Sequence, residues 1–363
     1  MNKRRYIIFL AVVLSLCLMV GCGKKQKKEE HKTESKTEDI QELIEQKDSY
    51  TFGFSGMNME DPYFDVVRQA MEIELKDYEI VLEVKDASMN QELQNQQINE
   101  FIEEGIDLLF LVPVDKKGIQ PGIDALNEAG IPIINIDTQV EDIDSVRSFV
   151  GSDNKDIGFM CGEHLIEKMP EGGNVVIIEN LSSHAVNDRI NGFEQVLSKE
   201  NFQVVSRKEA TCDIDGAYAA MMQAIEECRA KNAKIDAVMC GNDNMALGVE
   251  KALEEVYGRI TVEETEEEYL EGDTEEYTEE KTEEDKRIFV YGVNGSPDVK
   301  EVLASKESYI VATVAQSPIN MGMQAVEIAV DLIKNRDYDL EVTTPSFLIN
   351  NGNIVLYGTN GWQ

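Results

Sequence analysis

The strongest constraint on the fold is a repeating alternation of short apolar segments with longer segments of helical periodicity. From Tyr50 onward, runs rich in Val, Ile and Phe are typical of buried strands, and the stretches between most of them have the period of amphipathic helices. The predicted strands are 50–55, 79–84, 107–112, 132–136, 174–178, 203–207, 236–240, 287–293 and 309–315. The predicted helices are 62–77, 91–104, 116–129, 156–168, 187–200, 215–230, 243–256 and 318–335. This pattern predicts an α/β fold of parallel sheets flanked by helices.

The number of strands favours two sheets over one. A chain of 363 residues is long enough for about two domains. With 42% apolar residues, it can bury a core in each of them. Two helices are expected to begin at an N-cap followed by proline, at Asp61-Pro62 and Ser317-Pro318. We therefore expect two doubly wound parallel-sheet lobes.

The N-terminal residues are typical of an export signal. Three basic residues at positions 3–5 precede an apolar run, Tyr6–Val20, which is too short to span a membrane as a helix. The run ends in Met19-Val20-Gly21-Cys22, which resembles the lipobox of bacterial lipoproteins. We expect a signal peptide over 1–21 and a diacylglycerol-modified Cys22. An ordinary signal peptide with an incidental cysteine is the alternative.

The segment that follows is expected to be a flexible, lipid-anchored linker over 22–49, because it is polar and charged and cannot bury enough surface to fold alone. The protein is thus expected at the extracytoplasmic face of the cell membrane, held there only through lipid on Cys22.

The charge balance excludes several classes of partner. The chain has 34 Lys and Arg against 70 Asp and Glu, a formal net charge of −36. Nucleic acids and anionic membrane surfaces are both recognised mainly by Lys and Arg, so neither is expected as a partner. The three histidines have no metal-ligand spacing, and we expect no metal and no cofactor.

An acidic insert, 261–286, interrupts the alternation with fourteen acidic and two basic residues. It lies between a predicted helix and the next strand. Loops of that kind lie at the sheet edge opposite the ligand crevice, so we expect a solvated excursion away from the site. Binding of cations or of a basic partner is the alternative.

Polar or aromatic side chains follow nearly every predicted strand. They are Asn58, Asp61, Tyr63, Phe64, Asp86, Asn90, Asp137, Asn187, Asp188, Arg189, Asn242, Asp243, Asn244, Asn294, Gln316 and Ser317. Ligands of open parallel sheets bind beyond the carboxyl ends of the strands. No Ser-His-Asp set, glycine-rich phosphate loop or nucleotide fingerprint is among them, so an enzyme is not expected.

Such a set of side chains is suited to a neutral polyol, since carboxylates and amides accept from sugar hydroxyls while Arg and Asn donate to them. Tyr63 and Phe64 could cover apolar C–H faces. The alternative is that Asp61 and Asn242 serve only as helix caps, and that Arg189 forms a structural salt bridge. Four cysteines in the body, Cys161, Cys212, Cys228 and Cys240, are expected to be buried free thiols, with one disulfide as the alternative.

Eight motifs in order resemble the type 1 periplasmic binding proteins, the ribose- and galactose-binding group. They are EDPYF (60–64), LVPVDKKGI (111–119), AGIPIINID (129–137), FVGSDN (149–154), NDRINGF (187–193), GNDNMALG (241–248), VYGVNG (290–295) and ATVAQSP (312–318). The resemblance implies a three-strand hinge between an N-terminal lobe, 50–152 plus 317–345, and a C-terminal lobe, 153–316 plus 346–363.

The resemblance also implies which residues contact ligand. By position these are Asp61, Tyr63, Phe64 and Asp137 from the N-terminal lobe, with Arg189, Asn242, Asn294 and Gln316 from the C-terminal lobe and the hinge. Thr138, next to Asp137, is the ninth residue expected to contact ligand. Asn294 stands where the family usually has Asp, Thr138 where ribose binders have Arg, and no second stacking aromatic occurs in 211–216. The pocket is therefore altered, and the particular sugar is left open.

We expect a monomeric receptor for a monosaccharide or similar polyol that closes by hinge motion and delivers its ligand to a membrane ABC permease. The alternative is a sensory subunit that presents a sugar-like signal to a receptor kinase. A sugar-responsive repressor with this fold is excluded by the export signal at the position of a DNA-binding domain.

Overall fold

The computed structural model describes residues 49–260 and 287–362. The expected signal peptide, Cys22, all but the last residue of the linker, and the acidic insert lie outside the described residues. None of the helices in the described ranges is long and apolar enough to cross a bilayer.

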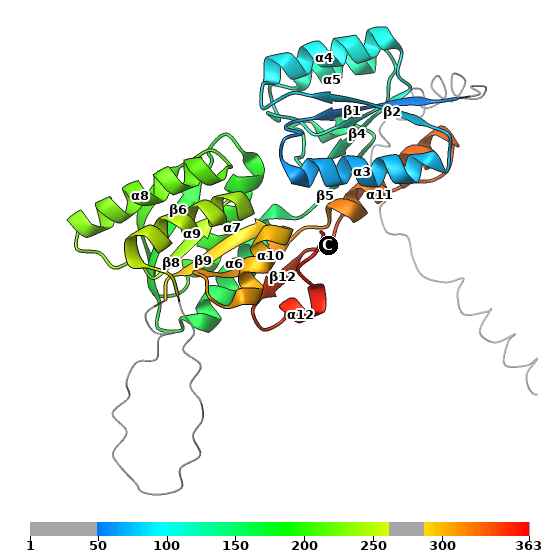
Figure 1. Ribbon diagram of the computed structural model, residues 1–363. Coiled ribbons are helices and arrows are strands. Elements are labelled where there is room, and N and C mark those ends of the chain that lie inside the picture. Colours follow the sequence, from blue (N-terminus) through cyan, green and yellow to red (C-terminus); the bar gives the residue numbers. More distant parts are fainter. Residues whose placement is uncertain (1–48, 261–286, 363) are drawn as a thin grey trace, which may run out of the picture. The chain divides into compact units, whose positions relative to one another are not determined.

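One sheet is built mainly from residues 51–151. Its strands are β1 (Thr51–Gly56), β2 (Val81–Asp86), β3 (Leu108–Leu111), β4 (Ile133–Ile136), β5 (Ser148–Gly151) and β11 (Glu341–Thr343). Their order is β11-β5-β4-β3-β1-β2, and every neighbouring pair is parallel. Helices α3 (Pro62–Lys76) and α11 (Pro318–Ile333) cover one face, with α4 (Gln91–Glu104) and α5 (Gln120–Glu128) on the other (Figure 1). A 3₁₀ turn, η1 (Ile143–Ser145), precedes β5.

A second sheet holds the middle of the chain. Its strands are β6 (Gly173–Glu179), β7 (Phe202–Glu209), β8 (Ala237–Cys240), β9 (Phe289–Asn294), β10 (Ile310–Ala315) and β12 (Phe347–Asn350). Their order is β12-β10-β9-β8-β6-β7, with only β12 antiparallel to its neighbour. Helices α6 (Asn154–Lys168) and α7 (His184–Leu197) share a core with one face. Helices α8 (Ile214–Ala230), α9 (Asp243–Tyr257) and α10 (Pro297–Ser305) share a core with the other.

The two bodies are the lobes expected from the strand count. The chain passes between the sheets after β5, after β10, and between β11 and β12, which gives three crossings. Strands buried on both faces explain the continuous apolar runs in the sequence. The fold is the two-lobe, doubly wound α/β architecture.

Several elements differ from the sequence-based expectation. The short strands β5, β11 and β12, helix α10 and the single turn α12 (Ile354–Tyr357) were not predicted. Helix α5 begins at Gln120 rather than 116, because the Asp115 carboxylate accepts from the backbone N–H groups of Lys117 and Gly118 and holds a turn there. Ser317 occupies an N-cap position, but its hydroxyl donates to the Pro345 carbonyl instead of capping α11.

Helices α6 and α7 pack closely because each has a glycine at the contact. A Cβ at Gly158 would overlap the carbonyl oxygen of Arg189, and one at Gly192 would overlap that of Lys155. These overlaps involve backbone atoms, which cannot move aside as a side chain can. The close approach brings the start of α6 next to Arg189.

Replacing Gly192 by Ala should therefore lower the free energy of unfolding by about 1–3 kcal/mol, since overpacking outweighs the better helix propensity of Ala. Chemical denaturation measures the change. Gly122→Ala in α5 is the matched control, because its Cβ would meet side-chain atoms of Ile98 and Asn95 that can move. A Gly192→Ala variant as stable as this control would contradict the account of the α6–α7 contact.

Candidate functional site

All nine residues expected to contact ligand line one cavity of about 410 Å³. They are Asp61, Tyr63, Phe64, Asp137, Thr138, Arg189, Asn242, Asn294 and Gln316. Asp61 to Thr138 come from the lobe of the first sheet, Arg189 to Asn294 from that of the second, and Gln316 from the crossing after β10. The structure thus brings together residues separated by as many as 255 positions, from Asp61 to Gln316.

On the first lobe, helix α3 and the loop after β4 supply the polar groups. The Asp61 carboxylate accepts from the Tyr63 backbone N–H at 3.0 Å, so Asp61 is both a helix cap and a lining residue. Asp137 has a left-handed backbone with φ of 61°, and its carboxylate accepts from the Thr138 hydroxyl at 3.0 Å. Buried Asn135 holds this loop by donating to the Thr138 carbonyl and accepting from the Val140 N–H.

On the second lobe, Arg189 is held rigidly beneath the cavity. Its Nε donates to Asn154 Oδ1 and its Nη1 to the Gly241 carbonyl, both at 2.8 Å. Only 5% of Arg189 is exposed, and its hydrogen-bond partners among the described residues are an amide oxygen and a backbone carbonyl, not a carboxylate. The structural salt bridge is therefore not its role; two anchored nitrogens instead orient the rest of the guanidinium.

Asn242 also combines two roles. Its Oδ1 caps α9 by accepting from the Met245 N–H at 2.8 Å, and its Nδ2 donates to the Cys212 carbonyl at 3.2 Å. Next to it, the Asp243 carboxylate accepts from the Thr313 hydroxyl and from the Ser296 N–H, both at 2.7 Å. Asp243 does not line the cavity, but it joins α9 to the ends of β9 and β10 that carry lining residues.

The crossing after β10 presents an unpaired acceptor to the cavity. Gln316 Nε2 donates to Asn294 Oδ1 at 2.9 Å, while the buried Gln316 Oε1 has no hydrogen-bond partner among the described residues. Asn294 has φ of 130°, a region that only glycine adopts freely. An orphaned acceptor and a strained backbone at one point are typical of a binding site.

Burial dominates the electrostatics of the two lining carboxylates. Desolvation raises the pKa of Asp137, and the Arg189 charge and hydrogen bonds from Thr138 and Tyr63 offset only part of this rise. Desolvation likewise raises the pKa of Asp61, against the backbone hydrogen bond from Tyr63. The cavity therefore holds two carboxyl groups that are poorly solvated.

Other polar residues at strand ends have structural roles away from this cavity. Asp86 accepts from the Met59 N–H, Asn90 caps α4, and Asn187 donates to the Leu181 carbonyl. Asn244 and Ser317 do not line it either.

Sequence reasoning missed Met57, Met89, Asn180, Ser182, Ser183, Ala185, Val186, Thr211, Cys212 and Asp213 as lining residues. Asn180 could have been found, because it is the first residue after β6.

The four cysteines of the body were expected to be buried free thiols, and only Cys212 differs, in its burial. All four in the body are free thiols, and Cys161, Cys228 and Cys240 are buried. Cys212 is only partly buried and lines the cavity, in the segment where a stacking aromatic was expected from the family resemblance. Burial raises its pKa to about 11, so the thiol is neutral at pH 7.

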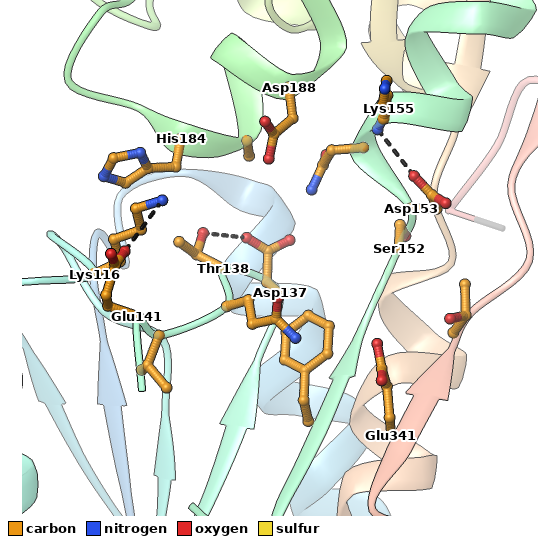
Figure 2. A pocket seen from close by; sticks show the side chains of 16 residues that line it. Lys116, Asp137, Thr138, Glu141, Ser152, Asp153, Lys155, His184, Asp188 and Glu341 are labelled. Carbon is orange, nitrogen blue, oxygen red and sulfur yellow. Dashed lines mark hydrogen bonds and ion pairs between the residues drawn. The ribbon is translucent and has the colours of Figure 1, made fainter. Parts of the chain in front are cut away.

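A second cavity of about 560 Å³ adjoins the first, since Asp137, Thr138 and Ala185 line both. Figure 2 shows Asp137 and Thr138 between Lys116 and Glu141 on one side and Ser152 and Asp153 on the other. Lys116 pairs with Glu141 at 3.4 Å, and Asp188 lines this cavity rather than the first. No group of His, Cys, Asp and Glu within 49–260 and 287–362 could hold a metal ion.

The chain belongs to the periplasmic binding protein domain family, which it matches over residues 52–337. It is similar to the ribose import binding protein of Bacillus subtilis strain 168, with 26% identity over 301 residues, 82% of this chain and 87% of that protein.

Two solved structures share the fold. One is an ABC transporter solute binding protein from Bacillus halodurans C-125 with bound myo-inositol, at 24% identity and a TM-score of 0.72, covering 85% of this chain and 96% of that one. The other is the fructose-binding periplasmic domain of a hybrid two-component system, at 20% identity and a TM-score of 0.72. The match covers 85% of this chain and 93% of that domain.

These findings confirm the family expected from the eight motifs. The protein is a solute-binding protein of an extracytoplasmic class and not an enzyme.

The raised pKa of Asp137 predicts a pH-dependent effect of Asp137→Asn. The folded protein binds this proton more tightly than the unfolded one, so stability falls as pH rises from the usual value of 3.8 through the folded pKa. At pH 7 the ionised group carries the whole desolvation cost. Ligand-free Asp137→Asn should therefore melt at a higher temperature than the parent at pH 7, and the difference should vanish below about pH 3.8.

Asp65→Asn is the control with the opposite sign. A hydrogen bond from Arg68 lowers the pKa of Asp65, so its loss should slightly reduce stability at neutral pH. Differential scanning calorimetry across this pH range measures both variants, and a lower melting temperature for Asp137→Asn at pH 7 would refute the desolvation argument.

Proposed function

We propose that this protein binds a monosaccharide or a similar polyol in the cavity lined by Asp137, Arg189 and Gln316, and delivers it to a membrane ABC permease. The observation that carries the proposal is the convergence of nine polar and aromatic side chains from both lobes on one cavity. Hinge closure over the guest would exclude water and strengthen each polar contact.

The unused hydrogen-bonding capacity of the lining residues matches a hydroxyl-rich neutral ligand. Gln316 Oε1 requires a donor, and the Asp137 and Asp61 carboxylates accept further hydrogen bonds. Arg189 retains its second terminal nitrogen as a donor after its two structural bonds. Each sugar hydroxyl both donates and accepts, so a polyol can satisfy both kinds of group.

The aromatic and apolar residues would cover the C–H faces of such a ligand. Phe64 and Tyr63 lie at one wall, with their ring centroids 5.2 Å apart at 86°. Met57, Met89 and Cys212 supply flexible or small apolar surface elsewhere in the lining. The relatives' names, which refer to ribose and to bound myo-inositol, indicate where a ligand search should begin.

Calorimetric titration tests the proposal. The protein is first unfolded and refolded to remove any bound ligand, and it is then titrated with pentoses, hexoses and inositols. At least one sugar should bind, and Asp137→Ala should weaken it at least about tenfold, since hydrogen bonds to a charged group contribute about 1.5–3 kcal/mol. Asp124→Ala, at an exposed site on α5, is the control and should leave affinity unchanged. If a folded preparation binds none of the panel, the sugar assignment is wrong.

We further propose that Cys22 carries the lipid that anchors the protein at the extracytoplasmic face of the cell membrane. Cys22→Ser should abolish incorporation of radiolabelled palmitate and release the protein from the membrane fraction. Cys17→Ser, inside the apolar run, is the matched control and should still be labelled. A parent protein that incorporates no label would instead favour an ordinary signal peptide, and labelling that persists in Cys22→Ser would contradict Cys22 as the lipid site.

A sensory role would use the same cavity, and the similar fold of a periplasmic domain from a hybrid two-component system makes it the second candidate. The two roles differ in what the loaded protein activates. Stimulation of ATP hydrolysis by a reconstituted cognate permease supports uptake. Ligand binding without such stimulation, together with activation of a kinase, favours sensing.

A further inference from the structure

The segment 358–362 connects the two lobes at the ligand cavity. It follows α12, whose Ile354 and Tyr357 pack on the core of the second lobe. The segment then reaches a residue of the first lobe, because the Trp362 ring lies against Tyr63 with centroids 5.8 Å apart at 70°. Tyr63 lies inside the region matched to the family, whereas Trp362 lies beyond its end at residue 337.

A buried lysine fastens this segment to the second lobe. Lys300 in α10 is fully buried, and its ammonium donates to the Gly361 carbonyl at 2.7 Å. An ammonium group is costly to desolvate unless it is hydrogen-bonded, and burial lowers the pKa of Lys300. The carbonyl of Gly361 and the nearby charge of Asp243 both favour the charged form, so the lysine and the segment stabilise each other.

At its other end the segment meets an aromatic cluster that lines the cavity. Tyr63 is 2% exposed and packs edge-to-face on both Phe64 and Trp362. Its hydroxyl lies 3.9 Å from Met321 Sδ, and Tyr63 and the Asp137 carboxylate line the same cavity and influence each other's pKa. A shift of the Tyr63 ring would therefore disturb both an aromatic wall and an acceptor of the cavity.

We propose that Trp362 is a positioning residue of the ligand site, held by Lys300 and acting through Tyr63. The inference rests on the proposed function in one respect, namely that the cavity lined by Tyr63 is where ligand binds. The contact between Trp362 and Tyr63 joins the two lobes in addition to the three chain crossings. Because it is made by side-chain packing, a substitution can remove it without changing the crossings.

The first test needs no ligand, because Trp362 is the only tryptophan of the sequence and reports on itself. Acrylamide quenching of its fluorescence should be weak in the ligand-stripped parent. The Stern–Volmer constant should rise at least about twofold in Tyr63→Leu and in Lys300→Met, which removes the ammonium and keeps an apolar side chain of similar length. Tyr218→Leu, at a distant site on α8, is the control and should leave quenching unchanged.

Quenching of the parent as strong as that of free N-acetyltryptophanamide would overturn the proposal. So would constants in Tyr63→Leu and Lys300→Met that equal the parent's. Both outcomes are independent of whether the protein binds a sugar, so a failed sugar assignment and a failed Trp362 contact are distinguishable.

The second test measures positioning with D-ribose and myo-inositol as probes. Trp362→Leu should weaken binding about 2- to 10-fold, the range expected for an edge-to-face aromatic pair, and Trp362→Phe should restore most of the affinity. In a Tyr63→Leu background, Trp362→Leu should have no further effect. Independent, additive losses from the two substitutions would refute action through Tyr63.

Discussion

The site depends on taking charged groups out of water and holding them by hydrogen bonds to neighbouring side chains and backbone. Asp137 and Arg189 are 7% and 5% exposed, and each is held by hydrogen bonds that leave part of its polar surface facing the cavity. Charged groups that are already desolvated and oriented need little rearrangement when a guest arrives. This arrangement is possible because parallel strands end at one edge of each sheet, where loops and helix starts supply polar side chains.

Much of the architecture could be predicted from the alternation of apolar and helical segments, because burial of a strand on both faces leaves a continuous run of Val, Ile and Phe. Short edge strands such as β11 and β12 were not predicted, because a run of three or four residues is too short to show a recognisable periodicity. Helix α10 was missed although Ser296-Pro297 is a good start, because nine residues hold only about two and a half turns of the pattern.

The nine lining residues that were expected could be predicted from the sequence because most of them lie at a strand end or a few residues beyond it, with Arg189 in the helix that follows β6. Their supports could not. Asn135 sits inside an apolar strand, and its role in holding the loop at Thr138 appears only once β3 and β4 are paired. The contact between Trp362 and Tyr63 joins positions 299 residues apart, and no local pattern encodes it.

Four lining residues, Asp61, Ser183, Asp213 and Asn242, also cap the helices that follow them. A change of side chain at any of these positions would alter ligand recognition and destabilise the first turn of a helix at the same time. Cys212 and Met89 line the same cavity and cap no helix. Substitutions among homologues should accordingly accumulate at positions such as Cys212 and Met89, which line the cavity and cap no helix. Changes there can alter ligand preference without destabilising the fold.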